Sequence, residues 1–108
     1  MAADNFTVGQ AKHSTLEAST VDSVTFTGPH TGIIRVRNRA TSGDPIYFRL
    51  YSPDYEGTQT APTVAGDDTY VVPFADLCDV GWPGNKVIVK LISAGTPDYS
   101  VESIAGLI

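Results

Sequence analysis

Cysteine is nearly absent from this chain. Cys78 is the only cysteine among 108 residues, so no disulfide can form within the chain, and a small secreted scaffold held together by disulfides is excluded. A chain of this length buries roughly 60–70% of the surface that its unfolded form exposes, which is enough for one core without disulfides or metal. We interpret Cys78 as a half-buried apolar residue, because the neighbouring acids Asp76 and Asp79 disfavour a reactive thiolate.

Basic residues and catalytic groups are also scarce. The 7 Lys and Arg against 12 Asp and Glu give a net charge of −5, which disfavours nucleic acid or an anionic membrane as a partner. The histidines are His13 and His30, and no nucleophile elbow, phosphate loop or zinc-ligand spacing occurs. We therefore expect no enzyme, no catalytic residues, no metal site and no cofactor. A Ser/His/Asp site assembled in space and a cation site at Asp67-Asp68 stay open as alternatives.

Long apolar runs are missing as well. No stretch is long enough to span a bilayer, and residues 1–6 carry neither a basic start nor an apolar run. We expect no signal peptide, no membrane partner and synthesis in a cytoplasm.

Val, Ile and Thr are abundant, and Gly and Pro recur every few residues, which favours short strands joined by turns. The predicted strands are 21–27, 33–39, 46–51, 68–73, 86–93 and 99–104, with a weaker one around 14–20. Turns are predicted at 28–32 and 80–85, a short helical turn at 73–78, and a long loop at 52–67. This spacing predicts an all-β fold, a two-layer antiparallel β-sandwich that is immunoglobulin-like or jelly-roll-like, with a small β-barrel as the alternative.

The domain division follows from the same pattern. Residues 16–108 are predicted to form a single β-sandwich domain. Residues 1–15 are weakly patterned, and we expect them to be an N-terminal arm that orders on a neighbouring subunit.

One predicted strand pair suggests a binding surface. Alternation directs Ile34, Val36, Phe48 and Leu50 inward. If residues 33–39 and 46–51 form an antiparallel hairpin, one outward face gathers most of the basic residues with two tyrosines. Arg and Tyr are favoured at interfaces, so we predict a partner-binding face for an acidic partner. It comprises Arg35, Arg37, Arg39, Tyr47, Arg49 and Tyr51. The alternative is a solvated face with Arg–Tyr stacking.

Three segments carry a family resemblance: residues 44–48, 67–73 and 87–101. They resemble small virion proteins of tailed phages that infect actinobacteria, and the resemblance covers residues 21–104. Residues 76–82 depart from it, since similar proteins have a plainer Ser/Thr-rich turn there.

The resemblance implies a structural protein of the virion, made in the host cytoplasm. It implies a capsid decoration or minor capsid protein that binds and stabilises the assembled head shell, with the major capsid protein, and neighbouring copies of itself, as partners. A neck or tail ring component is one alternative. A carbohydrate-binding module is another, with Tyr47, Tyr51, Tyr55 and Trp82 as stacking platforms.

Overall fold

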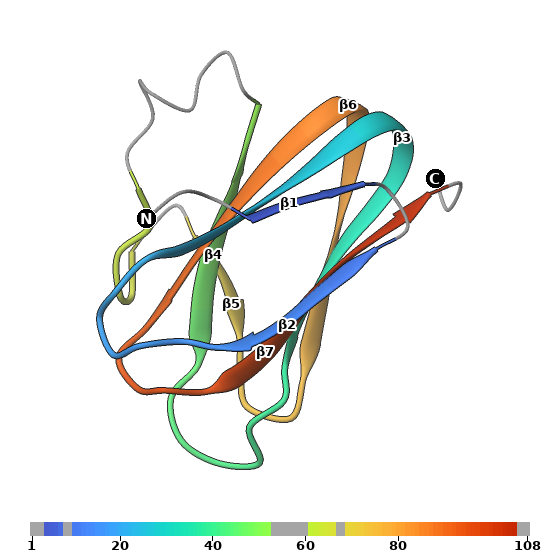
Figure 1. Cartoon of the computed structure of the whole chain (residues 1–108). Helices are drawn as coiled ribbons and strands as arrows, with labels where there is room; N and C mark the ends of the chain where they lie inside the picture. Colours follow the sequence, from blue (N-terminus) through green and yellow to red (C-terminus); the bar gives the residue numbers. More distant parts are fainter. Residues whose placement is uncertain (1–3, 8–9, 53–60, 67–68, 106–108) are drawn as a thin grey trace.

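The structure, a computed structural model, describes residues 4–7, 10–52, 61–66 and 69–105. In these ranges the chain forms strands and no helix that is long and apolar enough to cross a membrane. The strands (Figure 1) are β1 Asp4–Thr7, β2 Ala11–Thr15, β3 Asp22–Asn38, β4 Ile46–Tyr51, β5 Tyr70–Val72, β6 Leu77–Ser93 and β7 Asp98–Ala105.

The strands pack as a β-sandwich of two antiparallel layers, which confirms the predicted fold class. Pairing follows the order β2-β7-β3-β6-β4-β5, with β1 added in parallel to the first part of β3. The long strands β3 and β6 pair along nearly their whole length and contribute to both layers. One layer is β2, β7 and the second half of β3 with the first half of β6. The other is the first half of β3 and the second half of β6 with β4 and β5.

The turns predicted at 28–32 and 80–85 are not chain reversals, so these two predictions are wrong. Pairing continues through both segments, as His30 faces Gly84 and Thr31 faces Pro83. The register shifts once, between Thr27 and His30. Bulges and bends of this kind let a strand pass from one sheet of a sandwich to the other. Glycine and proline therefore form a corner here and leave the strands continuous, as the curved paths of β3 and β6 in Figure 1 show.

The core lies between the two layers. The inward positions that alternation predicts in β3, Ile34 and Val36, are fully buried, as is Phe48 in β4. Leu50, Cys78, Val80 and Trp82 pack against this core while staying partly exposed. The buried apolar cluster consists of Leu16, Val24, Phe26, Ile34, Val36, Ile46, Phe48, Val72, Val87, Val89, Leu91, Tyr99 and Val101.

The start of the chain is more regular than its sequence pattern predicts. Within the range assigned to the arm, β2 pairs antiparallel with β7, and β1 pairs with β3 of the same chain. Lys12 of β2 is buried. The weak strand predicted at 14–20 lies earlier, at Ala11–Thr15, and residues after Leu16 form a turn. Part of the segment predicted to be an N-terminal arm therefore consists of strands that pair within the same chain.

Candidate functional site

The predicted Arg–Tyr hairpin does not form, because β3 and β4 are not paired. The second half of β3 lies between β7 and β6, whereas β4 lies between β6 and β5. Arg35 and Arg37 therefore belong to one layer, with Arg39 directly after β3, while Arg49 belongs to the other. The six predicted residues form two separate groups on different layers, and the single face predicted from the sequence is wrong.

Arg35 is engaged within its own layer. Its Nε donates to Oδ1 of Asp79 on β6 at 2.8 Å, and its NH2 group donates to Oδ2 at 3.0 Å. The hydrogen bond from Arg35 holds the pKa of Asp79 below its usual range. Arg37 and Arg39 are exposed. The positive charge that this layer offers to a partner is therefore centred on Arg37 and Arg39.

The second group surrounds a tyrosine that is buried. Tyr51 is 3% exposed, although strand alternation predicts that it points outward. Arg49 lies over its ring at 5.6 Å from the centroid and Lys90 at 5.3 Å. Arg49 and Lys90 face each other across β4 and β6, where like charges are unfavourable. The tyrosine ring partly offsets this repulsion through cation–π contact with both side chains.

A hollow of about 250 Å³ opens where the two layers meet at their edges. Its walls come from β4, β5 and the first half of β6, and its lining residues are Arg49, Leu50, Tyr70, Val80, Gly81 and Trp82. The Tyr70 ring stacks on Phe48 at 5.1 Å between centroids and is itself 45% exposed. The Trp82 indole N–H donates to the Lys86 carbonyl at 3.3 Å. Among the predicted stacking residues, the structure places Trp82 and not Tyr47 or Tyr51 in this hollow, and Tyr55 lies outside the described residues.

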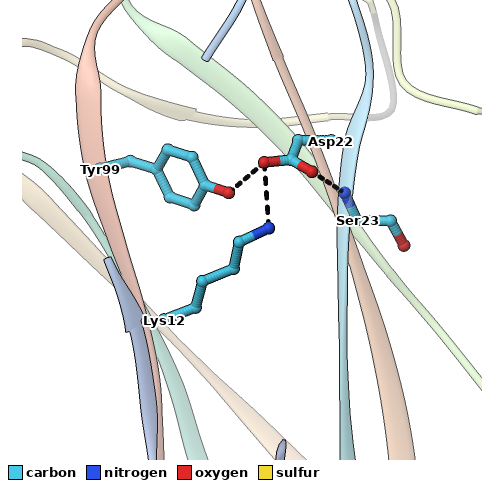
Figure 2. A network of polar contacts seen from close by, with 4 residues as sticks. All are labelled: Lys12, Asp22, Ser23 and Tyr99. Atoms are coloured by element: carbon cyan, nitrogen blue, oxygen red, sulfur yellow. Dashed lines mark hydrogen bonds and ion pairs between the residues drawn. The ribbon is translucent and has the colours of Figure 1, made fainter. Parts of the chain in front are cut away.

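A network of charged groups lies inside the sandwich near its β2 side (Figure 2). Asp22 of β3 accepts a hydrogen bond from the Tyr99 hydroxyl, and Lys12 Nζ lies 3.1 Å from the same carboxylate oxygen. The Ser23 backbone N–H donates to the other oxygen at 2.9 Å. The Lys12 side chain is 9% exposed and the Asp22 side chain 26%. The network ties β2, β3 and β7 together.

Asp22 and Tyr99 are each held in one protonation state. Burial acts to raise the pKa of Asp22, but the hydrogen bonds from Tyr99 and Lys12 outweigh it and hold that pKa below its usual range. Burial and the hydrogen bond to Asp22 raise the pKa of Tyr99 to about 12. At neutral pH, Asp22 is therefore a carboxylate and Tyr99 a neutral phenol that donates to it.

Other candidate chemical groups have partners within the domain or a shifted pKa. His13 Nδ1 lies 2.7 Å from Ser100 Oγ, but Ser100 is 2% exposed and the nearby Asp98 carboxylate accepts from Thr15. Burial, with Asp79 and Asp76, raises the pKa of the Cys78 thiol, as expected for an unreactive cysteine. In the part of the chain that the structure describes, no three His, Cys, Asp or Glu residues gather as metal ligands. Asp67 and Asp68 lie outside that part.

Comparisons with known proteins give one structural similarity. A scan against protein-family models gave no match, and a search of curated proteins gave no relative. The fold is similar to a crystal structure of the pre-peptidase C-terminal domain of a collagenase from Bacillus anthracis, with a TM-score of 0.59. The match covers 94% of this chain and 93% of that chain at 12% identity. This similarity establishes the class of protein as a β-sandwich domain of that architecture.

Sequence reasoning missed both the network and the hollow. Lys12 lies in a stretch with no clear alternation, so nothing marks it as buried. Tyr70 lies in the predicted strand 68–73 and Trp82 in the predicted turn 80–85. They line one hollow only because β4 pairs with residues 88–93 of β6. The sequence feature that could have indicated the hollow is the concentration of large apolar residues at 70–74 in an otherwise polar region.

Proposed function

We propose that this protein is a structural component of a phage virion, a capsid decoration protein that binds the assembled head shell through the major capsid protein. The observation that carries the proposal is the resemblance of residues 44–48, 67–73 and 87–101 to small virion proteins of tailed phages. These segments supply the first half of β4, β5, the second half of β6 and the start of β7. They contain eight of the thirteen residues of the buried core, so they specify the sandwich itself.

Two surface features support a role in binding another protein. Tyr70, Val71 and Phe74 are 45%, 50% and 46% exposed. They belong to β5, which lies at the end of the strand order, or to the two residues that follow it, and exposed apolar side chains at a sheet edge favour an interaction site there. On the layer that contains β7, Arg37 and Arg39 offer positive charge to an acidic surface. The chemistry of the proposal is binding alone, without catalysis and without a cofactor.

Stabilisation of the shell follows from linkage. A protein that binds the assembled lattice and not the dissociated subunits lowers the free energy of the lattice, and repetition over a symmetric shell multiplies a modest contact energy. Shells assembled from the accompanying major capsid protein should lose integrity at a higher temperature when saturated with this protein. Shells whose melting temperature is unchanged at saturation, or that bind none of it, would contradict the proposal.

A neck or tail ring is the nearest alternative within the virion. A ring requires a heterologous contact between copies, so the purified protein should assemble without shells. Sedimentation at high protein concentration separates the two roles: decoration predicts a monomer that binds shells, whereas a ring component assembles alone and leaves shells bare.

A further inference from the structure

One flank of the sandwich has an open strand edge. Between Leu77 and Trp82, β6 pairs with β3 on one side. On the other side β4 pairs only with residues 88–93 of β6, so no described strand pairs with this edge from Leu77 to Trp82. An open edge presents a row of backbone N–H and C=O groups that can pair with a further strand.

The hollow lies directly beside this edge. Val80, Gly81 and Trp82 of the open segment line it, and Tyr70 and Leu50 form its walls on the other layer. Val80, Trp82 and Leu50 also pack against the core. The hollow therefore borders the apolar interior, while Arg49 makes part of its lining polar, and its volume of about 250 Å³ suits a large side chain or two smaller ones.

Exposed apolar side chains concentrate on the same flank. The large apolar side chains that are most exposed in the described part of the chain are Val21, Val64, Tyr70, Val71 and Phe74. Three of these belong to β5 and the two residues that follow it. Among these residues Tyr70 lines the hollow, so its exposed ring borders the open edge of β6.

We propose that this flank binds an extended peptide segment, which adds as a strand to Leu77–Trp82 and places one of its side chains in the hollow that Tyr70 and Trp82 line. An extended backbone is the ligand that satisfies a row of alternating donors and acceptors. Its side chains alternate in direction, so every second one faces the hollow. Resting on the proposed function, we identify the segment as part of the major capsid protein in the assembled shell.

Hydrogen exchange tests the strand addition directly. Exchange of the backbone amides of residues 77–82 is measured by mass spectrometry on the full chain, free and bound to shells. Added pairing should slow exchange at these amides by about tenfold or more, because each opening then also breaks intermolecular hydrogen bonds. Residues 32–37, which are already paired on both sides, serve as the internal reference and should change little.

A pair of matched variants tests the hollow. Tyr70→Lys places a charge at its mouth and should weaken shell binding about tenfold or more, which corresponds to about 1.4 kcal/mol. Val21→Lys introduces the same charge at a residue of similar exposure, 38% against 45%, directly before β3 and not among the residues that line the hollow. It should bind as the native chain does. Circular dichroism and the unfolding midpoint verify that both variants fold.

The outcomes separate this inference from the proposed function. If the native chain does not bind shells, the proposed function fails. If it binds, but the exchange of residues 77–82 is unchanged and Tyr70→Lys binds normally, decoration stands and strand addition is wrong. Trp82 is the only tryptophan of the chain, so its emission reports directly on the hollow. A change in emission with chito- or arabino-oligosaccharides that Tyr70→Lys abolishes would assign the hollow to a glycan and overturn the inference.

Discussion

At the scale of single residues, the buried Lys12–Asp22 pair is the interaction whose loss should affect stability most. Removing one member of a buried ion pair leaves the other charge without compensation, which typically costs 3–5 kcal/mol, and less where the site is partly exposed. Asp22 is about a quarter exposed. The Tyr99 hydroxyl and the Lys12 ammonium both donate to the same carboxylate oxygen of Asp22. Asp22 therefore satisfies two buried donors from two other strands.

We predict that Asp22→Asn lowers the free energy of unfolding by about 2 kcal/mol, because it leaves the Lys12 ammonium without a counter-charge. Urea unfolding followed by Trp82 fluorescence measures the change. Glu17→Gln removes the same charge at an exposed turn position and is expected to change stability by less than about 0.5 kcal/mol. Equal effects of the two substitutions would show that the network does not stabilise the fold.

The decrease in the free energy of unfolding at acid pH should depend on Asp22. The pKa of Asp22 is lower in the folded chain than in the unfolded chain, so its contribution is present above the unfolded value, near 3.9, and is lost as pH falls through the folded value. Native stability should therefore decline below about pH 4. In Asp22→Asn this decline should be shallower, with Asp79 supplying part of what remains. If the stability of the native chain and of Asp22→Asn fell equally with decreasing pH, the lowered pKa of Asp22 would be contradicted.

Tyr99 should control how the free energy of unfolding changes at alkaline pH. Its pKa is raised from 10.0 to about 12 in the folded chain, so between these values the unfolded chain releases a proton that the folded chain retains. Stability is then full below pH 10 and declines as pH rises towards 12. Unfolding midpoints of the native chain and of Tyr99→Phe, measured across this range, should converge as pH rises. A constant difference between them would count against the raised pKa.

At the scale of secondary-structure elements, β2 connects the start of the chain to the domain. It pairs with β7, and its Lys12 reaches Asp22 on β3. We predict that deleting residues 1–15 lowers the urea midpoint strongly, because it exposes β7 as an edge and removes the counter-charge of Asp22. A truncated chain with the native midpoint would show that the segment is a dispensable arm, as its sequence pattern alone suggests.

The separation of the arginines onto two layers makes their roles distinguishable. We predict that Arg37→Glu weakens shell binding and makes the remaining binding less sensitive to salt. An exposed ion pair is worth about 0–1 kcal/mol, so the loss should be several-fold and not complete. Lys86→Glu, an equal charge reversal at an exposed position on the other layer, is the control. Weaker binding by Lys86→Glu, with Arg37→Glu unaffected, would place the docking surface on the layer of β4.

The strands were predictable where one face is buried, and the pairing was not. Alternation in 33–39 and 46–51 placed Ile34 and Phe48 inward because every second position of each strand faces the core. Which strands become neighbours depends on contacts distant in sequence, so β3 and β4 were paired wrongly from their proximity along the chain. Glycine and proline at 28–32 and 83–84 signal a change of direction, and local sequence does not distinguish a turn from a corner.

At the scale of the whole molecule, charge and apolar surface are unevenly distributed. The chain carries a net charge of −5, yet the layer of β7 offers Arg37 and Arg39, and the flank between β5 and β6 exposes apolar side chains beside an open strand edge. This distribution suits a domain that docks on one acidic and partly apolar surface and turns its remaining acidic surface to solvent. Like charge on the outer surfaces would also keep decorated particles apart.

Binding to assembled and unassembled capsid protein tests this account most directly. The full chain is mixed with intact shells and, separately, with dissociated major capsid subunits, and bound protein is quantified after sedimentation of the shells or pull-down of the subunits. The account predicts saturable binding to shells at a fixed ratio to the capsid protein, with little or no binding to free subunits at the same concentration. Binding to free subunits as tight as to shells, or no binding to shells at saturating concentration, would contradict it.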